Sequence, residues 1–221
     1  MASDHPITRS PDHPIPPLIL ASSSPRRSEI LTSLGIPFAV DPADVDEGLR
    51  PGESGEAAAS RLASEKAASV AGRHPGSWIL AADTLVLLDG DILGKPRDDS
   101  DAAQMLRRLA DREHRVVTAV RLRKGADAGR EMVVLSGVRM SPLSPDEIRW
   151  YVATGEPRDK AGAYAVQGLG ARFIESVNGS YTNVMGLPAR AVYSLLKETR
   201  DPKVEAWLLR TSQRSTADSR Q

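Results

Sequence analysis

The stretch Leu18–Phe38, LILASSSPRRSEILTSLGIPF, joins a short apolar run to an amphipathic segment through a serine-rich turn. Leu18 to Ala21 have the continuous apolar character of a strand that is buried on both faces. Ser24 followed by Pro25 is typical of an N-cap and a first helical position, and Gly35 is a typical helix end. The stretch therefore predicts a strand, a turn and a helix, which is how many α/β folds begin.

The turn of this unit has the residues of a phosphate-binding site. Backbone N–H groups and the positive end of the helix dipole converge there, and Ser22 adds a hydroxyl group. Arg26 and Arg27 fall in the first helical turn, where the dipole disfavours cations. A bound phosphate would compensate them, because guanidinium groups match phosphate oxygens in pairs. The alternative is two surface arginines on an ordinary helix, and this stretch alone does not decide between the two.

Composition excludes several classes of protein. The 221 residues include 29 basic and 29 acidic side chains, so no overall charge favours nucleic acid. There is no cysteine, which excludes a disulfide scaffold, a thiol nucleophile and a cysteine-ligated metal. No apolar run approaches the roughly 18–20 residues of a membrane helix. The N-terminus has no apolar signal-peptide core, so we expect a cytoplasmic protein.

Periodicity predicts further helices and strands along the chain. We expect helices at about 54–71, 99–111, 144–155 and 187–200, and strands at about 38–40, 78–88, 114–140 (a pair) and 171–181, with a short strand returning after the Asp89-Gly90 turn. Because strands and helices do not alternate strictly, we predict an α/β fold with a mixed twisted sheet. Residues 1–17 and 211–221 have the composition of flexible tails, which leaves 18–210 as a single domain.

Two of these elements carry a charged residue within an apolar pattern. Lys66 lies in the apolar stripe of the helix at 54–71, between Leu62 and Val70, and Asp83 interrupts the apolar strand at 78–88. A lysine in such a stripe either extends to the surface or points at an anion in a cleft. A buried carboxylate needs a cation, a metal or hydrogen-bond donors, so Asp83 is a candidate functional residue.

Loops add a second set of candidates. Lys95 follows the Asp-Gly turn, and Asp46 and Glu47 form an acidic pair; taken singly, each of these is as well explained as solvated surface. Together with Arg26, Arg27, Lys66 and Asp83 they suit a triphosphate with a divalent ion, because cations neutralise phosphates and carboxylates hold Mg²⁺ or activate water. The phosphate-binding loop of kinases and GTPases and the glycine-rich dinucleotide motif are both absent.

In these residues the chain resembles the Maf family of nucleotide pyrophosphatases. The matching segments occur in the expected order: LASSSPRRSEILTSLGIPF, RLASEKA, AADTLVLLDGDILGKPRD and DKAGAYAVQGLGARFIESVNGSYTNVMGLP. Each is modestly specific, but the four in series are a strong match over most of the chain from Leu18 to Lys197. The resemblance implies hydrolysis of a nucleoside triphosphate to the monophosphate and pyrophosphate with a divalent cation, Mg²⁺ or Mn²⁺. It also implies a fold similar to inosine triphosphatases, with two lobes around a cleft.

The resemblance also implies a role for each candidate. Asp83 matches the proton acceptor and a metal ligand, and Glu47 matches the acidic metal-side position. The phosphate-side positions are Ser22, Arg26, Arg27, Lys66 and Lys95.

Three positions separate the branches of the family: Arg26, Thr84 and Gln167 are similar to the branch that acts on dTTP and UTP. The branch that acts on 7-methyl-GTP has a bulky apolar residue, Gln and Glu there. The amide of Gln167 offers a donor and an acceptor to a pyrimidine edge, as this assignment requires. Without the resemblance, Thr84 would be a strand residue and Gln167 a turn residue.

Two other functions stay open. The chain could be a 7-methyl-GTP pyrophosphatase, or a nucleotide-binding regulator of cell division without important turnover. The intact set of carboxylates and lysines favours an enzyme. The expected partner is a nucleoside triphosphate, with neither nucleic acid nor membrane; a homodimer is compatible with the sequence, which does not fix the oligomeric state.

Overall fold

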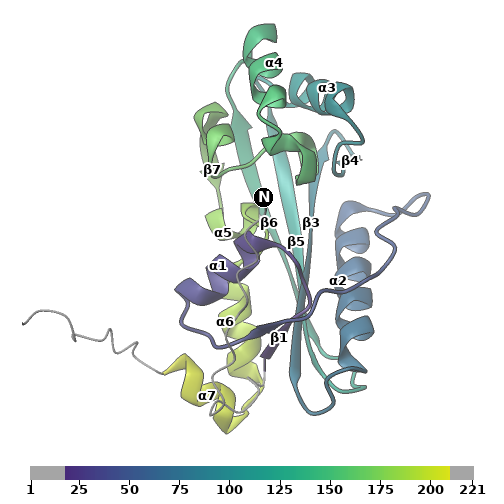
Figure 1. The fold of residues 1–221 in the computed structure, drawn as a ribbon, viewed down its shortest axis with the longest axis vertical. Helices are drawn as coiled ribbons and strands as arrows, with labels where there is room; N and C mark the ends of the chain where they lie inside the picture. The colour runs from purple at the N-terminus through teal and green to yellow at the C-terminus, as the bar shows by residue number, and fades with distance from the viewer. Residues whose placement is uncertain (1–17, 210–221) are drawn as a thin grey trace, which may run out of the picture.

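A central sheet with helices on both faces forms the structure, a computed structural model that describes residues 18–209 (Figure 1). The predicted tails, 1–17 and 211–221, lie outside this range. The strands are β1 Leu18–Leu20, β2 Ala39–Val40, β3 Trp78–Leu88, β4 Asp91–Leu93, β5 Glu113–Lys124, β6 Arg130–Met140 and β7 Ile174–Asn178. Their order is β2-β1-β3-β5-β6-β7, with β4 also paired to β3. Parallel and antiparallel pairs occur together, so the predicted mixed α/β sheet is confirmed.

On one side of β3, neighbouring strands pair with only part of its length, and the functional site lies at the unpaired part. β1 runs parallel to residues 78–80 of β3, and β4 runs antiparallel to residues 86–88. β5 pairs with residues 78–87 on the other side, so β1 and β4 must share the first side. Between them, residues 81–85 of β3 have no strand partner on that side within the described chain. The carboxyl ends of β1 and β4 therefore both lead to the same open edge.

Helices cover the two faces of the sheet differently. The α-helices are α1 Pro25–Ser33, α2 Gly55–Ala71, α3 Asp99–Leu109, α4 Pro145–Ala153, α5 Tyr181–Val184, α6 Ala189–Glu198 and α7 Pro202–Leu208. α2 packs alone along one face, against Ile79 and Leu87 of β3. On the other face, α1, α6 and α7 gather at one end of the sheet, and α3 and α4 lie at the opposite end (Figure 1).

The helix ends follow local rules in most places. Ser54 accepts a hydrogen bond from the N–H of Ala57, and Ser144 forms a full capping box with Glu147. Ser24 holds the predicted N-cap position of α1, but its side chain makes no capping bond; instead, its N–H donates to Ser22 Oγ at 3.2 Å. Gly35 takes a φ of +68° after α1, the left-handed conformation that glycine tolerates at a helix end.

The predicted elements differ from the structure mainly between the strands. The helix predicted at 99–111 ends at Leu109 in the structure; it buries Ala102, Leu106 and Leu109, and Met105 packs half-buried against the same cluster. The expected strand at 171–181 is shorter, since residues 169–173 form a 3₁₀ turn and 181–184 form α5. The 3₁₀ turns 156–159 and 161–163, and the helix α7, have no counterpart in the prediction.

Candidate functional site

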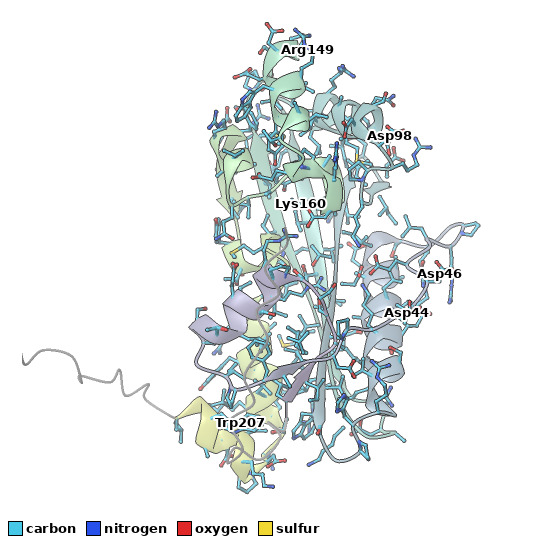
Figure 2. The ribbon with its side chains drawn as sticks, viewed as in Figure 1. Asp44, Asp46, Asp98, Arg149, Lys160 and Trp207 are labelled. Carbon is cyan, nitrogen blue, oxygen red and sulfur yellow. The ribbon has the colours of Figure 1, made fainter. Side chains whose placement is uncertain are left out.

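A cavity of about 730 Å³ lies at the open edge of β3. Its lining includes all the residues to which the family resemblance gives a role: Ser22, Arg26, Arg27, Glu47, Lys66, Asp83, Thr84, Lys95 and Gln167. Asp46 does not line it, and its Oδ1 accepts instead from the N–H of Gly48 at 2.9 Å. Asp44 and Asp46 lie on the loop beside α2 (Figure 2).

The topology explains this convergence. The carboxyl end of β1 delivers the serine turn and the first turn of α1, and the carboxyl end of β4 delivers Lys95. The unpaired part of β3 between them carries Asp83 and Thr84. Because side chains alternate along a strand, Asp83 faces α2 and Thr84 faces the opposite side. The cavity therefore reaches both sides of the sheet at its edge.

Lys66 joins the two carboxylates of the site. Its Nζ lies 2.6 Å from Asp83 Oδ1 and 2.6 Å from Glu47 Oε1. Glu47 Oε2 accepts from Lys95 Nζ at 2.9 Å. Lys66 and Asp83 are buried, whereas Glu47 keeps 44% of its side chain exposed. The apolar-stripe position of Lys66 thus points into a cleft with anionic partners, and does not extend to the surface.

The two carboxylates have opposite pKa shifts. Burial raises the pKa of Asp83 above its ordinary value, although the charges of Lys66 and Arg27 oppose this. Burial also acts to raise the pKa of Glu47, but hydrogen bonds from Lys66 and Lys95 outweigh it and bring the pKa to about 2. Two adjacent acids whose environments separate their pKa values are suited to different tasks, one as a proton acceptor and one as a permanent charge.

Arg27 is held by neutral groups only. Its Nε donates to the carbonyl of Gly186 at 2.9 Å and its Nη1 to Ser22 Oγ at 2.9 Å, while Nη2 lies 3.4 Å from Thr84 Oγ1. No carboxylate of the described chain comes within salt-bridge distance of it. Burial lowers the pKa of this guanidinium, while Asp83 and Glu47 act in the opposite sense. A positioned cation without a carboxylate partner, lining a cavity, is suited to an anionic ligand.

The three positions that separate the branches of the family, Arg26, Thr84 and Gln167, all line the cavity. Thr84 Oγ1 is 2.9 Å from Thr118 Oγ1, so its hydroxyl is already engaged with the protein. Gln167 is exposed at the rim. Arg26, in the first turn of α1, is partly buried. Its Nη1 lies 3.9 Å from Oδ2 of Asp159, a residue across the cavity from α1.

Sequence reasoning missed the residues that the segment 158–166 contributes. Arg158, Asp159, Lys160 and Tyr164 line the cavity, and Figure 2 shows Lys160 at mid-height of the molecule. Lys160 Nζ donates to the carbonyl of Glu156 at 2.7 Å and to Asp159 Oδ1 at 2.6 Å. Asp159, Lys160 and Tyr164 belong to DKAGAY, residues 159–164, which opens one of the segments that resemble the family, and this match could have indicated them. With these additions the cavity carries six cationic side chains and three carboxylates, an excess of positive charge that suits a polyanion.

The donor set fits a divalent cation only together with a ligand. Among residues 18–209, no three His, Asp or Glu side chains lie close enough together to hold a metal ion. Glu47 and Asp83 do converge, since both contact one ammonium nitrogen. Mg²⁺ commonly takes one or two carboxylates and completes its shell with phosphate oxygens and water. The two acids are therefore suited to such an ion beside a phosphate chain.

The chain is similar to known proteins over most of its length. Residues 17–199 match the family described as Maf-like protein. Proteins named dTTP/UTP pyrophosphatase from Anaeromyxobacter sp. and Myxococcus xanthus are 49% and 50% identical, over 84% of this chain in each case and 90% and 93% of theirs. A solved nucleoside-triphosphatase, named as a dITP/XTP pyrophosphatase, from Mycobacterium abscessus aligns with 83% of the chain and 99% of its own, at 16% identity and a TM-score of 0.40. No helix of the described residues is long and apolar enough to cross a membrane. The chain belongs to the Maf-like family.

Proposed function

We propose that this chain is a nucleoside triphosphate pyrophosphatase that hydrolyses dTTP and UTP to the monophosphate and pyrophosphate. The single observation that carries the proposal is the Lys66 ammonium between Asp83 and Glu47, in a cavity that also holds Arg27, which has no carboxylate partner among residues 18–209. The name shared by relatives that are about half identical to this chain supports the same activity and substrates.

In this proposal the triphosphate lies over the turn between β1 and α1. Ser22, Arg26 and Arg27 contact it from one side, and Lys66 and Lys95 from the other, so that positive charge surrounds the phosphate oxygens. Thr84 and Gln167, with Arg26, select the base. Lys95 and Lys66 also fix Glu47, whose low pKa keeps it charged at any physiological pH.

Asp83 is the proton acceptor of the reaction. The contacts of the described chain engage only its Oδ1, through Lys66, which leaves Oδ2 for a water molecule. The water oxygen bonds to the α-phosphorus, its proton passes to Asp83, and the bond from the α-phosphorus to the bridging oxygen breaks to release pyrophosphate. Mg²⁺ or Mn²⁺ at Glu47 and Asp83 would supply charge neutralisation for the phosphate oxygens.

The substitution Asp83→Asn tests this role. Asparagine keeps the size of the side chain but cannot accept the proton, so turnover of dTTP should fall by about 10²–10⁴-fold. A non-hydrolysable triphosphate should still bind. Asp91→Asn is the matched control, because Asp91 is an exposed strand carboxylate paired with Arg108 outside the cavity. Parental turnover in the Asp83→Asn variant would exclude Asp83 as the base.

A panel of triphosphates separates the remaining alternatives. Pyrophosphate release would be measured for the common nucleotides, for 7-methyl-GTP and for modified pyrimidine triphosphates, each with Mg²⁺, with Mn²⁺ and with neither. Preference for 7-methyl-GTP would move the chain to the other branch of the family. Binding without release would favour a regulator of cell division. A cytoplasmic location and a homodimer remain predictions beside this proposal.

A further inference from the structure

Glu47 comes from a segment that has no regular structure of its own. Residues 41–54 connect β2 to α2 and contain no helix or strand. Glu47 is half-exposed, and its contacts are with the two site lysines, Lys66 and Lys95. A charged side chain on such a segment needs its backbone fixed by other residues if it is to meet Lys66 at 2.6 Å.

Arg61 of α2 fixes the backbone next to Glu47. Its Nη2 donates to the carbonyl oxygen of Gly48 at 3.0 Å. The same guanidinium makes a fork with Glu53, through Nε to Oε1 at 2.8 Å and Nη2 to Oε2 at 2.8 Å. The side chains of Arg61 and Glu53 are only 12% and 11% exposed. Planar, partly buried forks of this kind hold geometry better than exposed single contacts do.

The helix that carries Arg61 also carries Lys66. Glu65, beside Lys66, accepts from Arg61 Nη1 at 3.2 Å and from Arg50 Nη2 at 3.0 Å. One helix thus holds the segment through Arg61 and Glu65 and presents the lysine that Glu47 must reach. Lysine could not replace Arg61, because one ammonium cannot form the planar fork with Glu53 and bond Gly48 in the same geometry.

We infer that Arg61 is a positioning residue, which fixes the backbone at Gly48 so that Glu47 lies against Lys66 and Lys95. Its effect on turnover rests on the proposed function, whereas its effect on the segment does not. Arg73, two residues after the end of α2, offers a control with the same kind of contact. It makes a similar fork with Asp41, at 2.8 and 2.9 Å, and so holds the far end of the segment, but it does not contact the residues next to Glu47.

The first test is a double-mutant cycle on pyrophosphate release. Arg61→Gln and Arg61→Lys should each lower kcat/KM at least about tenfold, while Arg73→Gln should change it by less than about twofold. If Arg61 acts through Glu47, then Arg61→Gln should add no further loss to Glu47→Gln. A general structural role predicts instead that the two losses multiply, and that result would overturn the inference. Thermal unfolding establishes that each variant is folded.

The second test does not depend on the reaction. Hydrogen exchange at the amides of residues 46–50 should speed up in Arg61→Gln and stay at the parental rate in Arg73→Gln, with the middle of α2 unchanged in both. Parental exchange rates at residues 46–50 in Arg61→Gln would overturn the inference. If the parental protein released no pyrophosphate from any triphosphate, the proposed function would fail, and this exchange measurement would still decide the role of Arg61.

Discussion

A single ammonium group between two carboxylates decides the electrostatics of the site. Lys66 bonds both Asp83 and Glu47, and its charge is the largest influence that holds the pKa of Asp83 down against burial. In the proposed reaction Asp83 must be ionised to accept a proton, so the acid limb of the pH profile of turnover should follow its pKa. Removal of the Lys66 charge should therefore move that limb to higher pH.

Lys66→Met is the variant that measures this shift. Methionine has a similar length and no charge, so it leaves burial to raise the pKa of Asp83 further. The acid limb of the plot of kcat against pH should move to higher pH, and dTTP turnover near neutral pH should fall. Lys66→Arg keeps the charge and should leave the limb close to its parental position. A Lys66→Met profile with an unmoved acid limb would contradict the assignment of that limb to Asp83.

At the scale of single residues, much of the candidate site could be predicted from the sequence. Asp83 and Lys66 are charged residues within apolar periodic patterns, so their burial and need for partners could be inferred. The partnership of Glu47 with both lysines could not, because an irregular loop has no periodicity from which its direction follows. Thr118 and Asn183 also escaped notice, since a buried threonine and asparagine resemble ordinary strand and turn residues until their neighbours are known.

Between elements, a chain of hydroxyl groups connects the sheet to Arg27. Thr118 of β5 is fully buried and donates to the carbonyl of Asn183 at 3.1 Å. Since this uses its one hydrogen, the Thr84 hydroxyl of β3 donates to Thr118 across 2.9 Å and faces Arg27 as an acceptor. Asn183 in turn bonds the carbonyl of Val116 through Nδ2. α5, β5 and β3 thereby hold the guanidinium in place together.

Thr118→Val should disturb this arrangement without changing the shape of the core. Valine removes the short Thr84–Thr118 contact and one of the two hydrogen bonds to the Asn183 carbonyl, which still accepts from the Gly186 N–H. The free energy of unfolding should fall by about 0.5–1.5 kcal/mol. Because Thr84 and Arg27 lose their alignment, kcat/KM for dTTP should also fall. Thr118→Ser keeps the hydroxyl and should retain turnover. Denaturant midpoints and initial rates measure the two effects, and full activity in Thr118→Val would refute the connection.

The segment 156–173 shows why some elements could not be predicted. Its turns are organised by the Glu156 carboxylate, which accepts from the Tyr151 hydroxyl and from the N–H groups of Leu169 and Gly170. Gly170 is required there, because a Cβ would lie 2.5 Å from the carbonyl oxygen of Ala165 and 2.5 Å from the Tyr151 hydroxyl. The hydrogen bonds of Glu156 join residues 5, 13 and 14 positions apart, which matches neither the helix nor the strand period, so no periodic pattern in the sequence predicts them. The regular elements β3, α2 and α4 followed their periodicity and caps.

Across the whole molecule, the face of the sheet opposite α2 carries two hydrophobic clusters. Leu80, Val120 and the residues under α1, α6 and α7 form one cluster, and Val86, Val116 and the residues under α3 and α4 form the other. Figure 1 shows α7 at one end of the elongated molecule and α3 and α4 at the other. The cavity is lined by Val86 and Val116 of the second cluster and by Met185, which packs against the first. β3 and β5 contribute residues to both clusters, so we propose that residues 18–210 fold as one cooperative unit.

Leu106→Ala tests this cooperativity from one end of the molecule. Leu106 of α3 is fully buried in the second cluster, and its truncation should destabilise the protein by about 2–5 kcal/mol. Trp78 and Trp207 report on the first cluster, whereas Trp150 lies on α4 beside the second. Fluorescence of variants that keep only one of these two sets should give coincident denaturant transitions, both moved equally by Leu106→Ala. If the Trp150 signal alone moved, β3 and β5 would not couple the two ends, and the lobes would be separate folding units.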